Sequence, residues 1–156
     1  MAGELVTFLT AMTPIGELRA SIPLGILTFD LSWPLVLLIS IAGNLVPVPF
    51  IILGLRRTGR WLESFPNPAG RFLLWRSARL EAQLAGSISR YGPMAIVLIV
   101  AIPLPMTGAW TGSLAVWALK VPLRQGLPAI AAGVVIAGVV VTALTLAGVG
   151  VVKLFS

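Results

Sequence analysis

The sequence contains no cysteine and no histidine, and only five acidic residues among 156. Without cysteine the chain has no disulfide and no thiolate chemistry, and without either residue type it lacks the usual ligands of zinc. Charged residues make up 10% of the chain, against about 25% in soluble globular domains. That is too little polar surface to cover a water-facing shell, so the composition predicts that much of the surface meets lipid.

The signatures of common enzymes are missing as well. The sequence has no Gly-x-x-x-x-Gly-Lys phosphate loop, no Gly-x-Ser-x-Gly elbow and no paired carboxylates. The N-terminal stretch also lacks the lysine or arginine of a signal peptide, so we expect no cleaved leader. The sequence therefore predicts a protein that is not an enzyme and that uses no cofactor and no metal.

Long apolar runs are what the sequence has in abundance. Hydrophobic residues make up 58% of the chain, and no charged residue occurs in residues 31–55, 91–119 or 125–152. Since about 20 apolar residues cross the hydrocarbon core of a bilayer, each run is a membrane candidate. We expect an all-α integral membrane protein with a single domain over residues 1–156, and the lipid bilayer as its partner.

Two of the apolar segments, residues 3–29 and 93–119, are interrupted near their centres. The interrupting residues are Pro14, Gly16 and Pro23 in the first segment and Pro103, Pro105 and Gly108 in the second. Proline removes a backbone donor and clashes with the preceding helical turn, so we expect two helical hairpins that break at these residues. Residues 34–55 and 127–152 follow the hairpins and are predicted transmembrane spans. The order indicates an internal repeat, residues 1–55 and 91–156.

The connection between the halves, residues 56–90, carries seven arginines and two glutamates. The net charge of the chain is +6, but the basic residues cluster between apolar runs, which favours cytoplasmic loops and not nucleic acid. Arginine mixed with Trp61, Phe65, Phe72 and Trp75 is typical of an amphipathic element on anionic lipid, although an ordinary solvated loop is an alternative. Residues 77–90 are predicted to form a short helix.

The charges that flank the hairpins predict how each one enters the membrane. Lys120 and Arg124 follow the second hairpin, so both of its ends are expected on the cytoplasmic side and the hairpin is re-entrant. Glu4 and Asp30 flank the first hairpin, and no lysine or arginine lies beside them outside the hairpin. The first hairpin is therefore expected to enter the membrane from the outer side, and both termini of the chain are expected on that side. The halves then form an inverted-topology repeat, as in transporters. Four plain crossings are the alternative.

Glu17 and Arg19 lie at the break of the first hairpin. A charge at bilayer depth costs at least about 2.5 kcal/mol, so these two residues are expected to be paired with each other, hydrated, or not at that depth. In the functional interpretation, Arg19 binds an anion and Glu17 orients it or carries a proton. In the alternative, the hairpin is shallow and both side chains reach the outer interface.

The second hairpin offers uncharged polar groups, from Thr107, Trp110 and Thr111. Thr107 is a candidate cap for the second half-helix, whose first amide groups would suit an anion. The alternative for the threonines is a hydrogen bond to a carbonyl of their own helix. Asn44, in the first predicted span, needs a partner in lipid and is expected to face the hairpins.

A stripe of small residues, Ala129, Gly133 and Ala137, recurs every four residues in the last predicted span. Small residues at this spacing let membrane helices approach closely. Irregular backbone at membrane depth must be buried in protein or line water, and a monomer this small would leave much of the hairpins exposed. We therefore expect a homodimer, with this stripe as one candidate seam.

The stretches "PIGELRASIPLGI", "GNLVPVPFIILGLRR" and "AIPLPMTGAWTGSLA" resemble the small multidrug export protein family of bacteria and archaea over nearly the whole chain. This family is distantly similar to the DedA and VTT membrane proteins, which are implicated in moving lipids such as undecaprenyl phosphate. The resemblance implies two re-entrant hairpins and a prokaryotic plasma membrane location. By motif position it selects Glu17 and Arg19 in the first element, and Thr107, Gly108, Trp110 and Thr111 in the second.

These observations predict a small transporter or lipid translocase whose site lies between the two hairpins. Its substrate is expected to be an anionic or amphipathic small molecule or lipid, with proton coupling as a further expectation. One alternative is a structural or accessory membrane protein that transports nothing. Another is a cation-drug exporter, which fits the family name but not the guanidinium of Arg19.

Overall fold

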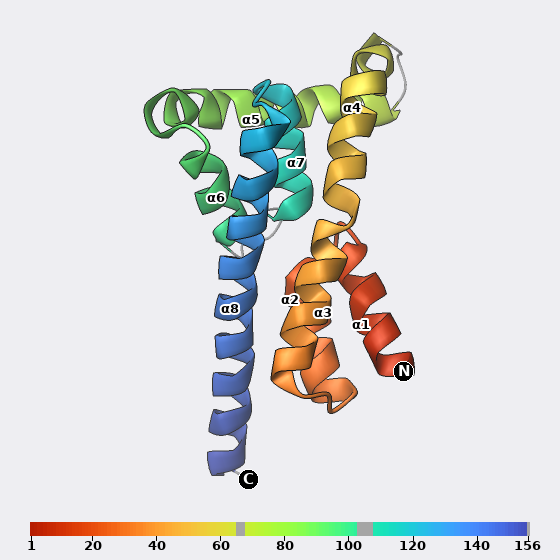
Figure 1. Ribbon diagram of the computed structural model, residues 1–156, viewed down its shortest axis with the longest axis vertical. Coiled ribbons are helices and arrows are strands. Elements are labelled where there is room, and N and C mark those ends of the chain that lie inside the picture. Colours follow the sequence, from red (N-terminus) through yellow and green to blue (C-terminus); the bar gives the residue numbers. More distant parts are fainter. Residues whose placement is uncertain (65–67, 103–107, 156) are drawn as a thin grey trace.

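The computed structural model describes residues 1–64, 68–102 and 108–155, and the elements within these ranges are all helices (Figure 1). In chain order they are α1 (Ala2–Met12), α2 (Glu17–Pro23), η1 (Leu24–Thr28), α3 (Trp33–Leu45), α4 (Pro47–Ser64), α5 (Pro68–Tyr91), α6 (Met94–Ala101), α7 (Ala109–Ala118) and α8 (Leu123–Phe155). The predicted all-helical class is therefore confirmed for the described part of the chain.

The first hairpin consists of α1 and the continuous path of α2 and η1. Both arms run from a turn at mid-height to the end of the molecule that carries the termini (Figure 1). The turn lies between Met12 and Glu17, where the sequence placed Pro14 and Gly16. Thr13 holds it closed, because its hydroxyl donates to the Thr10 carbonyl at 2.8 Å and accepts from the Gly16 amide at 3.0 Å.

Pro23 does not break the first hairpin, and this expectation was wrong. The helix continues through Pro23 into η1, a π-helical turn in which the Phe29 amide donates to the Leu24 carbonyl at 3.3 Å. The wider π turn accommodates Pro23, whose ring leaves no backbone N–H to donate. Membrane helices tolerate proline where such a local π turn gives the freed carbonyl groups new hydrogen-bond partners.

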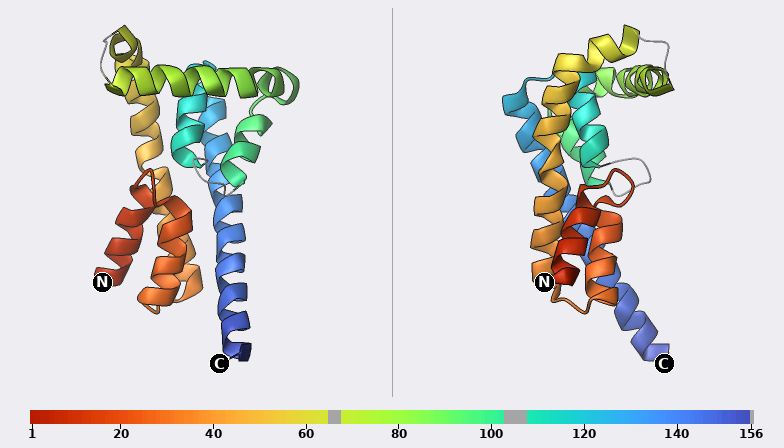
Figure 2. Two further views of the ribbon diagram at one scale, coloured as in Figure 1. Left: turned by 180° about the vertical axis from the view of Figure 1, so that it is seen from behind. Right: turned by 90° about the vertical axis from the view of Figure 1, so that its right-hand side faces the viewer.

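The second hairpin consists of α6 and α7, which run between the level of α5 and mid-height (Figure 1). Gly108, with a φ of 125°, is the N-cap of α7. Pro103, Pro105 and Thr107 lie outside the described residues. The two hairpins approach each other from opposite ends of the molecule, so the ends of α1 and α2 near the first turn come close to the start of α7 at mid-height (Figure 2).

Two helical stretches, Trp33–Thr58 and Leu123–Gly150, are long and apolar enough to cross a membrane. The first begins at Trp33 with Pro34 in its first turn, as the sequence predicted. Large apolar side chains project outward from both stretches, among them Leu38, Phe50, Val139 and Leu144, which are 67%, 72%, 52% and 65% exposed. Water would not favour such a surface, and lipid would.

Helix α5 lies crosswise to α4 and α8 at the end of the molecule opposite the termini (Figures 1 and 2). We call this end the basic end, because the arginines of residues 56–90 gather there. The expected short helix over residues 77–90 is in fact one helix of 24 residues that begins at Pro68. Residues 56–64, expected in the linker, extend α4 instead. On α5 the Arg79 guanidinium lies 5.7 Å from the centre of the Trp75 ring.

The small-residue stripe of α8 is buried inside the chain. Gly133 packs so closely on α6 that a Cβ atom there would lie 2.6 Å from the Cβ of Val100. Ala129 and Ala137 are only 6% and 5% exposed. The proposed dimer seam was therefore wrong, because α6 already occupies this face of α8.

Candidate functional site

Glu17 is the first residue of α2 and has a φ of 44°, a conformation that side chains other than glycine rarely adopt. Only 4% of the residue is exposed. The left-handed backbone, set by the Pro14–Gly16 turn, directs the carboxylate across to the second hairpin. Its Oε1 accepts a hydrogen bond from the backbone amide of Trp110 at 3.4 Å.

Gly108 makes room for this carboxylate. A Cβ atom at Gly108 would overlap with Oε2 of Glu17. Immediately after Gly108 comes the first turn of α7, whose unpaired amide groups carry partial positive charge. Glu17 thus acts as a helix cap supplied by the other hairpin. The sequence placed a cap at Thr107 and a bound anion at these amides, whereas the N-cap is Gly108 and a carboxylate of the chain lies there.

Trp110 adds a second bond between the hairpins. Its indole Nε1 donates to the Met12 carbonyl, at the end of α1, over 3.1 Å. One residue of α7 is therefore bound to both arms of the first hairpin, through its backbone to Glu17 and through its ring to Met12. These two bonds fix the start of α7 against the first hairpin at the centre of the molecule.

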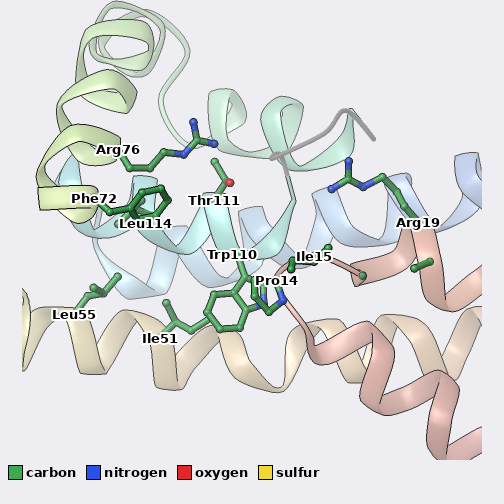
Figure 3. Close-up of a pocket in the computed structure, with 12 residues that line it drawn as sticks. Pro14, Ile15, Arg19, Ile51, Leu55, Phe72, Arg76, Trp110, Thr111 and Leu114 are labelled. Carbon is green, nitrogen blue, oxygen red and sulfur yellow. The ribbon is translucent and has the colours of Figure 1, made fainter. Parts of the chain in front are cut away.

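Beside this contact lies a pocket of about 740 Å³, which we call the hairpin pocket (Figure 3). The first hairpin, α4, α5 and α7 form its walls, with the residues Pro14, Ile15, Gly16, Arg19, Ala20, Ile51, Leu55, Phe72, Arg76, Trp110, Thr111 and Leu114. Its size is that of sites for drug-sized ligands, about 300–1,000 Å³.

Arg19 and Arg76 are the two charged groups among the described residues that line the hairpin pocket. In Figure 3 their side chains extend from opposite ends, Arg19 from α2 and Arg76 from α5, with Thr111 close to Arg76. Aliphatic and aromatic side chains form the walls between them. Two guanidinium groups in an apolar cleft suit an anion attached to an apolar body.

Arg19 and Glu17 do not form an ion pair in the described structure. Glu17 turns toward α7, and Arg19 turns into the hairpin pocket. The left-handed backbone of Glu17, with its φ of 44°, directs its side chain away from that of Arg19. The pair therefore divides into an acidic residue that joins the hairpins and a basic residue that faces the pocket.

Asn44 and Glu17 lie at the same small cavity, separate from the hairpin pocket. This cavity has a volume of about 10 Å³, and Arg19 and Gly108 line it as well. The side chain of Asn44 is buried, and its Oδ1 has no hydrogen-bond partner in the described residues, nor has Oγ of Ser40 one turn earlier. The cavity has room for about one water molecule.

Arg76 is the site residue that sequence reasoning missed. It is one of seven arginines in residues 56–90, and the sequence did not distinguish among them. The available signal was Phe72, one helical turn earlier on the same face of α5, which also lines the hairpin pocket. Among the residues described, no group of three or more His, Cys, Asp or Glu side chains could hold a metal ion.

These features define a class: a small helical membrane protein in which two hairpins meet beside an apolar pocket with two arginines. The family model described as "Putative small multi-drug export protein" matches residues 17–140, and the chain belongs to this family. Neither a curated protein nor a solved structure matches the chain.

The family match confirms the resemblance to the small multidrug export proteins. The family and the two long apolar helices agree with a location in a membrane. The more distant similarity to the DedA and VTT proteins is not tested by this match and stays a prediction. The family's printed name refers to export, and it leaves the charge of the exported compound open.

Proposed function

We propose that the protein is a membrane transporter for anionic amphiphiles, and that the hairpin pocket is its binding site. One observation carries the proposal: the described lining of this pocket has two arginines and no acidic residue. Arg19 and Arg76 would each offer a guanidinium fork to an anionic group, and a phosphate or a carboxylate suits such a fork because it presents two oxygens to it. The apolar walls would hold the hydrocarbon part, as in a lipid phosphate.

The same charge disfavours the export of cationic drugs by this pocket. Two guanidinium groups in an apolar cleft would repel a cation, and Glu17 is turned away toward α7. A structural or accessory role, the other alternative, would not require a pocket of about 740 Å³ at the meeting point of the hairpins.

In this proposal the hairpins are re-entrant and the halves form an inverted-topology repeat in a prokaryotic plasma membrane. The basic end faces the cytoplasm, as the positive-inside rule requires, and both termini lie outside. The protein acts without enzymatic chemistry and without a cofactor. Glu17 and the small cavity beside Asn44 are the candidate path for a coupled proton. We expect a homodimer, through a surface other than the Ala129–Gly133–Ala137 stripe.

Flux of a fluorescent phosphatidic acid in proteoliposomes tests the proposal. Arg19→Gln and Arg76→Gln should each lower the initial rate about tenfold or more, because a hydrogen bond to a charged group contributes about 1.5–3 kcal/mol. Arg19→Lys should fall between wild type and Arg19→Gln, since lysine keeps the charge and loses the planar fork.

Arg90→Gln is the matched control, because Arg90 lies on α5 beside Tyr91 and does not line the hairpin pocket. Its flux should equal that of the wild type. Wild-type flux in both Arg19→Gln and Arg76→Gln would contradict the proposal and favour the accessory role.

A further inference from the structure

A second pocket, of about 610 Å³, lies at the basic end and shares no lining residue with the hairpin pocket. It is formed where α4, α5 and the turn after α7 meet, and we call it the basic-end pocket. Its lining residues are Arg56, Ser77, Glu81, Trp117, Ala118, Lys120 and Pro122. The transport site proposed above does not use any of these side chains.

The basic-end pocket contains charges of both signs. Arg56 and Lys120 supply two cationic groups, and Glu81 supplies a carboxylate from α5. A phosphodiester would match the two cations, while a primary ammonium group would match the carboxylate with three N–H donors. We propose that this pocket binds the headgroup of a membrane phospholipid that carries both a phosphodiester and a primary amine, as phosphatidylethanolamine does.

The backbone of Lys120 supports a role for its side chain. The turn after α7 is a Schellman motif, in which the Lys120 amide donates to the Trp117 carbonyl at 3.1 Å and the Val121 amide to the Val116 carbonyl at 3.0 Å. Lys120 occupies the left-handed position, with a φ of 54°. Glycine usually fills this position because it has no Cβ atom. A lysine at this position is strained, and Lys120 lines the pocket. Backbone strain of this kind gathers at functional sites.

Arg56 holds the same turn from α4. Its Nη2 donates to the Val121 carbonyl at 2.8 Å, across 65 residues of sequence. A guanidinium has five N–H donors in a planar fork, so this bond leaves others for a phosphate oxygen. The bond also holds α4 against the turn that contains Lys120, so that both cationic residues line one pocket.

The level of the pocket indicates a lipid and not a soluble ligand. The pocket lies beside α5, which runs crosswise at the basic end (Figure 1), where α4 and α8 would leave the hydrocarbon core. Basic pockets between membrane helices at this level bind lipid headgroups. Glu81 favours an ethanolamine headgroup over the other two phospholipid headgroups. A carboxylate repels a purely anionic headgroup such as that of a glycerol phospholipid, and it cannot accept a hydrogen bond from the quaternary amine of choline.

Native mass spectrometry of protein in nanodiscs with equal amounts of ethanolamine, choline and glycerol phospholipids, with matched acyl chains, tests the proposal. The wild type should retain the ethanolamine lipid at least fivefold over each of the others. Lys120→Gly should retain at least fivefold less of the ethanolamine lipid than the wild type, because one partner of the phosphodiester is gone, while its melting temperature stays equal or rises, since glycine relieves the left-handed strain. A folding defect would instead lower both the retention of the lipid and the melting temperature.

Glu81→Gln should lose the preference for the ethanolamine over the glycerol lipid, because the partner of the amine is gone. Arg124→Gln is the control, since Arg124 is exposed at the start of α8 and does not line the pocket; its preference should equal that of the wild type. Equal retention of all three lipids by the wild type, wild-type retention of the ethanolamine lipid by Lys120→Gly, or a wild-type preference in Glu81→Gln would overturn the proposal. Binding of soluble glycerophosphoethanolamine as tight as that of the lipid would overturn the assignment to a lipid.

Discussion

Glu17 is buried to 4% exposure at the centre of the molecule, where a carboxylate needs compensation. On insertion scales a charge at bilayer depth costs at least about 2.5 kcal/mol. The backbone amide of Trp110 and the amino end of α7 offset part of this cost. The acidic residue of the first hairpin therefore serves first as the contact that joins both hairpins, and it leaves Arg19 as the residue that faces the hairpin pocket.

Gly108→Ala tests this contact at the scale of one residue. The added Cβ would overlap with the Glu17 carboxylate, and alanine does not adopt the φ of 125° found there. We expect a loss of roughly 3 kcal/mol or more of folding stability, because the backbone strain and the overlap add. A fall in melting temperature in detergent, followed by tryptophan fluorescence, would show it.

Gly86→Ala is the matched control for Gly108→Ala. Gly86 lies inside α5 with no atom within 4 Å of the position of a Cβ, so alanine should be neutral or should raise the melting temperature through its higher helix propensity. Equal melting temperatures for Gly108→Ala and the wild type would contradict the contact between Gly108 and Glu17.

At the scale of elements, the packing of α6 on α8 replaces the dimer seam that the sequence indicated. The stripe of Ala129, Gly133 and Ala137 has the spacing of a helix-packing face, and it does pack a helix. The spacing alone does not say whether that helix belongs to the same chain or to a second copy. Here α6 fills the groove, with Val100 seated against Gly133.

Gly133→Ala should therefore destabilise the fold of each chain. Its Cβ would lie 2.6 Å from the Cβ of Val100 and 2.9 Å from the Val97 carbonyl oxygen, so α6 must shift away from α8. We expect a lower melting temperature, by about 1–3 kcal/mol of stability as for other overpacked sites. Light scattering on the folded fraction in detergent should give the same particle mass as for the wild type.

Gly148→Ala is the control on the same helix, since nothing lies within 4 Å of its Cβ position. Its melting temperature should not fall. A change of particle mass in Gly133→Ala, with an unchanged melting temperature, would restore the stripe as a seam between two copies.

Local signals made several of these elements predictable. Proline after tryptophan marked the start of α3, and Pro14 with Gly16 marked the turn of the first hairpin. Pro23 was misplaced as a break because a π turn can satisfy the backbone around a proline, and no local signal for this turn was recognised. The arginines of α5 suggested an interfacial element, but Arg76 could be identified as a pocket residue only from the packing of α5 above α7 and α4.

At the scale of the whole molecule, the hairpins approach each other from opposite ends and both termini lie at one end (Figures 1 and 2). The membrane topology proposed from this arrangement can be tested with single cysteines, because the chain has none of its own. Ser89→Cys and Gln125→Cys lie on either side of the second hairpin, and Ser32→Cys follows the first.

A membrane-impermeant maleimide applied from each side of oriented vesicles should label residues 89 and 125 from the cytoplasmic side and residue 32 from the outside. A re-entrant second hairpin begins and ends on the same side, whereas a single crossing would place residues 89 and 125 on opposite sides. Labelling of these two positions from opposite sides would contradict the re-entrant arrangement.

The central claim is that the hairpin pocket selects negative charge. The most direct measurement is the binding of dodecyl phosphate and dodecyltrimethylammonium, which share a tail and differ in the charge of the head, to the wild type and to Arg19→Gln/Arg76→Gln in nanodiscs. The wild type should bind the phosphate at least tenfold more tightly, and the double variant should lose this difference. A wild type that prefers the ammonium compound, or a double variant that keeps the wild-type preference for phosphate, would contradict the account.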